Sequence, residues 1–108
     1  MRVLFDQGTP IGIRDSLPEH SVRTVRQQGW STLLNGELLR VAEESGFDVL
    51  LTTDKNIASQ QNLTNRKIAI VALGRSRWSL IRQVLGRISA AIADAKPGTF
   101  TVLEVPEK

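Results

Sequence analysis

The feature that most constrains the fold is a short apolar run, Val49 to Thr53, followed at once by the acidic residue Asp54. A run this short, apolar and β-branched predicts a strand buried on both faces. The N-terminus repeats the arrangement, because the apolar Val3-Leu4-Phe5 precede Asp6 and the breaker Gly8 follows. The sequence therefore predicts two buried strands, each with an aspartate at its carboxyl end.

Helical and strand patterns alternate along the rest of the chain. Helical patterns run from the predicted N-cap Thr9 and Pro10 toward Leu17, from Asn35 or Gly36 to Gly46, from Lys55 to about Leu63, and from Arg77 to Ala95. The other strand patterns are Ser21 to Val25, Lys67 to Leu73 and Phe100 to Val105, and Gln27 to Asn35 has the composition of a loop. Such alternation is typical of an α/β fold with a central, mostly parallel sheet. We expect five strands, with the first and third near the middle.

The length of 108 residues predicts a single domain over residues 1–108. No apolar run approaches the roughly 20 residues of a membrane span, and Met1-Arg2-Val3 leads directly into a strand, so we expect no signal peptide. The chain has no cysteine, which excludes disulfides and thiolate metal sites and fits a reducing compartment. We therefore expect a cytoplasmic protein.

The charge is distributed unevenly. Residues 1–54 hold five arginines and eight acids, a net charge of −3, whereas residues 55–108 hold nine Lys or Arg and three acids, a net charge of +6. The acidic half suits a bound cation, and the basic half suits a polyanion such as nucleic acid. The alternative is that both halves are ordinary solvated surface.

Three acids are candidates for a metal site. Asp6 and Asp54 end neighbouring parallel strands, so we expect their carboxylates to approach each other, and Glu37, in the first turn of a helix, is expected to join them. Crowded carboxylates need a proton or cation to neutralise them, and hard oxygen ligands suit Mg²⁺ or Mn²⁺. Such a metal activates water and stabilises charge on a phosphodiester, so the predicted chemistry is metal-assisted phosphodiester hydrolysis.

Each acid also has a structural interpretation. Asp54 is suited to cap the predicted helix that starts at Lys55, and Asp6 is suited to form an Asx turn over Gly8. Glu37, in the first turn of its predicted helix, is favoured there by the helix dipole alone. His20 is the only histidine, which excludes a histidine metal cluster. Two pairs of residues have either a binding or a structural role. Trp30 and Trp78 either stack on bases or pack in the core, and Arg75 and Arg82 either contact phosphates or are solvated.

With these residues in hand, the chain resembles the PIN-like superfamily, specifically its small stand-alone bacterial toxin-like branch. The matching stretches cover about residues 1 to 90 and read MRVLFDQGTP, LPEHSVRTVRQQGW, NGELLRVAEESGFDVLLTTDKNIASQQNL and KIAIVAL. The resemblance implies a three-layer α/β/α sandwich around a parallel sheet. It also implies a Mg²⁺- or Mn²⁺-dependent ribonuclease, the toxin of a toxin–antitoxin pair that a small antitoxin protein neutralises, and a homodimer that forms through helices.

Carried over by position, Asp6 matches the acid after the first strand, Glu37 the helix acid and Asp54 the acid after the central strand. These three are the predicted catalytic and metal-binding residues. The predicted substrate-binding residues are Lys55, Asn56, Gln60, Arg75 and Arg82.

Two departures from the branch pattern support an alternative. Related proteins commonly read Asp-Glu-Asn after the first strand and Thr-x-Asp-x-Asp-Phe after the central strand, whereas this chain has the amides Gln7 and Asn56 in place of two acids. The alternative is a PIN-like module that binds RNA or protein without catalysis. A third interpretation is a receiver-like domain phosphorylated on Asp54, although its lysine, Lys96, precedes the last strand instead of following it.

Overall fold

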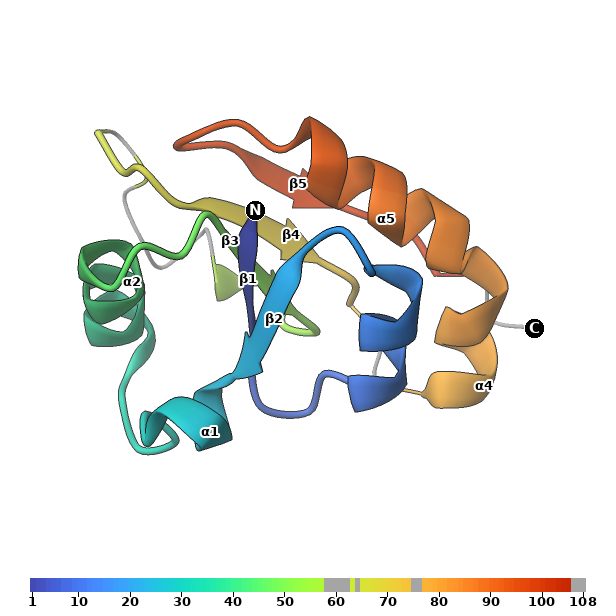
Figure 1. Ribbon diagram of the computed structural model, residues 1–108, viewed down its shortest axis with the longest axis horizontal. Coiled ribbons are helices and arrows are strands. Elements are labelled where there is room, and N and C mark those ends of the chain that lie inside the picture. Colours follow the sequence, from blue (N-terminus) through green and yellow to red (C-terminus); the bar gives the residue numbers. More distant parts are fainter. Residues whose placement is uncertain (58–62, 64, 75–76, 106–108) are drawn as a thin grey trace.

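The five strands form one sheet in which every neighbouring pair is parallel, in the order β2-β1-β3-β4-β5. The computed structural model describes residues 1–57, 63, 65–74 and 77–105. The strands are β1 Arg2–Phe5, β2 Ser21–Thr24, β3 Val49–Thr52, β4 Ala69–Ala72 and β5 Phe100–Val102. The prediction of an α/β fold with five strands is thus confirmed, and the first and third strands are adjacent near the middle (Figure 1).

Helical segments connect these strands. They are the 3-10 helix η1 Ile11–Ser16, α1 Val25–Gln28, α2 Asn35–Glu44, α4 Trp78–Ile81, the 3-10 helix η2 Arg82–Val84 and α5 Leu85–Asp94. Figure 1 shows α2 on one side of the sheet and α4 with α5 on the other. No helix within the described ranges has the length and apolar character that a membrane crossing requires.

Two apolar clusters cover the two faces of the sheet, because successive side chains of a strand point to opposite faces. One cluster joins strand residues to η1, α4 and α5: Val3, Phe5, Val49, Leu51 and Val71 pack with Ile13, Leu17, Ile81, Ile88 and Ile92. The other joins strand residues to α1 and α2: Leu4, Leu50 and Ile70 pack with Val25, Leu38, Leu39 and Ala42. Burial on both faces explains why the central strands read as uninterrupted apolar runs.

The predicted continuous helix from Arg77 to Ala95 is wrong, because the segment divides into α4, η2 and α5. The break falls at Val84, whose φ of −124° and ψ of 21° lie outside the helical range. Val84 is β-branched and Gly86 follows shortly after, and both residue types are poor helix formers. The apolar spacing that suggested one helix is preserved, since Ile81, Val84, Ile88 and Ile92 all stay buried.

The predicted loop from Gln27 to Asn35 is wrong at its start, because α1 occupies Val25–Gln28. A capping box begins that helix: Thr24 Oγ1 accepts from the Gln27 N–H at 3.0 Å, and the Thr24 N–H donates to Gln27 Oε1 at 2.9 Å. This cap also ends β2 one residue earlier than predicted. The third, fourth and fifth strands are likewise shorter than predicted, and most of the predicted helix from Lys55 to Leu63 lies outside the described residues.

The predicted N-cap Thr9 is also wrong. The cap of η1 is Pro10, and Thr9 Oγ1 instead donates to the carbonyl oxygen of Leu51 at 3.2 Å. Thr9 thereby ties the loop after β1 to the end of β3.

Candidate functional site

The chain leaves β1 and β3 toward opposite faces of the sheet. The segment after β1 leads to η1, whose Ile13 belongs to the cluster with α5, whereas the segment after β3 leads to Ile57, which belongs to the cluster with α2. Because β1 and β3 are neighbours, their carboxyl ends flank a topological switch point. Open α/β sheets bind their ligands in the crevice at such a point.

Asp6 and Asp54 stand at this switch point and are joined through Thr52. Asp6 directly follows β1 and is half-buried, and Asp54 lies two residues beyond the end of β3 and is exposed. Thr52 Oγ1 donates to Asp6 Oδ2 at 2.9 Å and accepts from the Asp54 N–H at 3.1 Å. Among the described residues, Thr52 is the one polar side chain that is fully buried. A buried hydroxyl thus links the two predicted metal-binding positions.

Backbone groups orient both carboxylates. Asp6 Oδ1 accepts from the Gln7 N–H at 2.9 Å, and the Asp6 N–H donates to the carbonyl oxygen of Leu51 at 2.9 Å. Asp54 Oδ1 accepts from the Asn56 N–H at 2.8 Å, which is the hydrogen bond of an Asx turn. An ionised carboxylate offers about four lone-pair positions, so these bonds leave acceptor capacity for a ligand.

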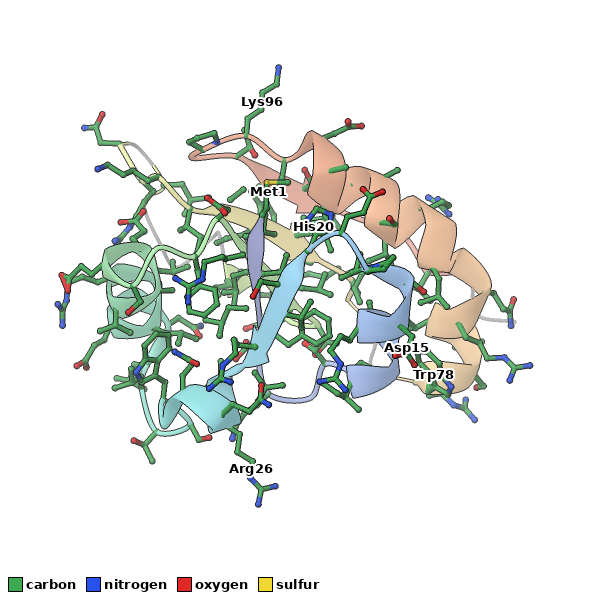
Figure 2. All side chains as sticks on the ribbon, viewed as in Figure 1. Met1, Asp15, His20, Arg26, Trp78 and Lys96 are labelled. Carbon is green, nitrogen blue, oxygen red and sulfur yellow. The ribbon has the colours of Figure 1, made fainter. Side chains whose placement is uncertain are left out.

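A pocket of about 450 Å³ opens beside Asp6. It is lined by the end of β1, the following loop, η1 and the start of α1: Phe5, Asp6, Gln7, Gly8, Thr9, Ile11, Thr24, Val25 and Arg26. Arg26 supplies a cation that the sequence analysis missed, and Figure 2 shows it extending from α1. The capping box of Thr24 and Gln27 was the sequence signal that would have located it.

Glu37 does not join the two aspartates. It lies in the first turn of α2 with 54% of its side chain exposed, and it pairs with Arg40 at 3.9 Å. Within residues 1–57, 63, 65–74 and 77–105, no three His, Asp or Glu side chains come close enough together to hold a metal ion. Of the three predicted acids, the structure thus connects Asp6 and Asp54 through Thr52 and places Glu37 beside Arg40.

The predicted substrate-binding residues are distributed over several elements. Lys55 and Asn56 are exposed beside Asp54. The aliphatic part of the Lys55 side chain lies over Gly74, since a Cβ added to Gly74 would be 2.5 Å from Lys55 Cδ. Arg82 is exposed on η2. Gln60 and Arg75 lie outside the described residues.

Comparison of the chain with protein-family models, with curated proteins and with solved structures finds no match. The resemblance to the PIN-like superfamily thus rests on the sequence stretches quoted above and stays a prediction.

Proposed function

We propose that this protein is a Mg²⁺- or Mn²⁺-dependent ribonuclease whose metal is held by Asp6 and Asp54. The observation that carries the proposal is the pair of aspartates at the switch point, linked by the buried hydroxyl of Thr52. Strand ends hold both residues in place, so their positions do not depend on a flexible loop alone.

The donor set fits the proposed metal. Mg²⁺ keeps several waters and is commonly bound by one or two carboxylates that substrate phosphates complete. Two aspartates with spare acceptor capacity meet that requirement without a third acid. When bound, such a metal lowers the pKa of its water and stabilises the charge that develops on a phosphodiester.

The chain's own cations suit the rest of the substrate. Lys55 directly follows Asp54 and is exposed, and Arg26 lines the pocket beside Asp6. Both can neutralise phosphates on either side of the scissile bond, which is the main source of affinity for a nucleic acid. The pocket gives room for a nucleotide next to Asp6.

The first test compares Mn²⁺ binding and RNA cleavage in wild type, Asp6→Asn and Asp54→Asn. Both variants remove one charge and keep the side-chain volume, so we expect folded proteins. Residues that only support metal ligands contribute about 10- to 100-fold to affinity or activity, so loss of a ligand itself should exceed about 100-fold. Glu44→Gln, an exposed acid on α2, is the matched control. Full cleavage by Asp54→Asn would refute the proposal.

The toxin role in a two-gene module rests on the resemblance alone. It is tested by expressing the protein in growing bacteria, where wild type should arrest growth and Asp54→Asn should relieve the arrest. Growth arrest of equal strength by both proteins would contradict a nuclease toxin.

A second candidate function is a module that binds RNA without catalysis. Gln7 and Asn56 favour it, because both are exposed beside the aspartates and both are amides where related proteins have acids. This function predicts RNA binding that weakens with salt, does not change with chelator, and is not followed by cleavage.

A further inference from the structure

Trp78, the first residue of α4, is a large aromatic side chain that remains 40% exposed. Its ring lies over Gly12 of η1, since a Cβ at Gly12 would be 2.8 Å from Trp78 Cη2. Figure 2 shows Trp78 at the start of α4, in the same part of the view as Asp15 of η1. The absence of a side chain at Gly12 therefore seats the indole against η1 and leaves part of the ring open to solvent.

The seat of Trp78 and the pocket beside Asp6 both involve the first turn of η1. Ile11 directly precedes Gly12, is 49% exposed and lines that pocket. Ile11, Gly12 and Trp78, called the η1 platform below, connect the lining of the pocket, through two consecutive residues of η1, with the first residue of α4.

Arginines flank the η1 platform. Arg77 directly precedes Trp78, and Arg82 follows it at i+4, the spacing that places two side chains on one helix face. Arg14 follows Ile11 at i+3, the spacing at which side chains of a 3-10 helix eclipse. All three arginines are exposed, and so is one acid of η1, Asp15, which follows Gly12 at the same i+3 spacing and offsets one of the three positive charges. The platform therefore combines an aromatic ring with an excess of positive charge.

We propose that the η1 platform stacks an unpaired base of single-stranded RNA whose phosphodiester lies at Asp6 and Asp54. This inference rests on the proposed function, because it assigns the neighbouring nucleotide of the same substrate. Every base has a π-face that an aromatic side chain can stack on, and flanking arginines add phosphate contacts and cation–π attraction. A purely apolar partner surface would gain nothing from the three arginines. Base-paired RNA keeps its bases stacked inside the helix, so the site selects single strands.

The test is binding of a fluorescein-labelled single-stranded RNA decamer, measured by anisotropy in EDTA so that no cleavage occurs. We expect Trp78→Ala to weaken binding about tenfold and Trp78→Phe, which keeps a ring, to stay within about threefold of wild type. Arg82→Gln should weaken binding more than Arg40→Gln, a matched charge loss on α2. Duplex RNA should bind more weakly than the single strand and be indifferent to Trp78→Ala.

A second measurement separates stacking from a structural role. Trp30→Phe leaves Trp78 as the sole tryptophan and keeps a ring against Phe47. Stacking of a base on Trp78 should then quench the tryptophan fluorescence as RNA is added. Gly12→Ala crowds the indole without removing it, and should reduce both the quenching and the affinity.

The two proposals fail in different ways. RNA binding that depends on Trp78, without metal-dependent cleavage, would refute the nuclease and support the platform. Cleavage that depends on Asp54 but is unchanged in Trp78→Ala, with no fluorescence quenching, would refute the platform alone. Self-association that Trp78→Ala abolishes, with no effect on RNA affinity, would also overturn the platform, since it would assign this surface to a second copy of the chain.

Discussion

Replacing Thr52 by valine removes the hydroxyl that joins the two aspartates and nearly preserves the shape of the side chain. The hydroxyl donates to Asp6 Oδ2 at 2.9 Å and accepts from the Asp54 N–H at 3.1 Å. A hydrogen bond to a charged group contributes about 1.5–3 kcal/mol and a neutral one about 1 kcal/mol. Because Asp6 is only half-buried and Asp54 is exposed, water replaces part of this, so we expect Thr52→Val to destabilise the protein by about 2 kcal/mol.

The assay is urea denaturation followed by circular dichroism. We expect the midpoint to fall while the slope with urea stays constant, which is the signature of lost stability without a change in compactness. Thr101→Val is the matched control, because Thr101 is half-buried on β5 and its hydroxyl has no partner among the residues that the structure describes. The control should change the unfolding free energy by less than about 0.5 kcal/mol.

A double-mutant cycle locates the effect. Thr52→Val combined with Asp6→Asn should cost less than the sum of the single changes, with a coupling free energy of about 1 kcal/mol. The Mn²⁺ affinity of Thr52→Val should also fall about tenfold, since Thr52 orients the carboxylate of Asp6, the proposed metal ligand. Additive effects in the cycle, together with unchanged Mn²⁺ affinity, would refute the view that Thr52 organises the site.

Two further predictions concern stability. Glu43 accepts from the Lys67 and Ile68 N–H groups and pairs with Arg66. Burial raises the pKa of Glu43, but these hydrogen bonds and Arg66 together hold the pKa below the ordinary 4.5. The ionised carboxylate therefore stabilises the folded protein above pH 4.5, and this stabilisation is lost as the pH falls below that value. In Glu43→Gln the urea midpoint should therefore fall less steeply as the pH is lowered through the acidic range. A midpoint that falls as steeply as in wild type would contradict this. Gly29→Ala should destabilise by roughly 1–2 kcal/mol because φ is +79°, whereas Gly86→Ala in α5 should stabilise by about 0.5–1 kcal/mol; thermal unfolding of the pair checks the opposite signs.

The central strands were predictable because both of their faces are buried. All four residues of β3 and of β4 are buried, so no polar, solvent-facing residues alternate with the apolar ones. Each strand is therefore recognisable in the sequence as an uninterrupted apolar run. The helical side of the fold was less predictable. A helix interrupted at Val84 buries nearly the same residues as a continuous one, so the apolar spacing from Ile81 to Ile92 is the same in both cases.

The candidate site was predictable where strand ends define it. Asp6 and Asp54 follow adjacent strands, and the sheet order brings them to one edge whatever the loops do. Glu37 was harder to place because its position depends on how α2 is rotated about its axis, which packing of Leu38, Leu39 and Ala42 decides. Thr52 escaped notice because a threonine at the end of an apolar run resembles any other β-branched strand residue.

The all-parallel order has a consequence for how the protein forms during synthesis. Parallel neighbours cannot be joined by a tight hairpin, and β1 has to pair with β3, where Val3 lies opposite Val49. The hydrogen bond between Asp6 and Thr52 spans 46 residues of chain. Translation proceeds at roughly 5–20 residues per second, so β3 is synthesised several seconds after β1. Pairing of strands so far apart in the sequence is slow, because the entropy of loop closure is lost before the stabilising contacts form. A nascent chain therefore holds no assembled pair of aspartates until its third strand has been translated and has docked.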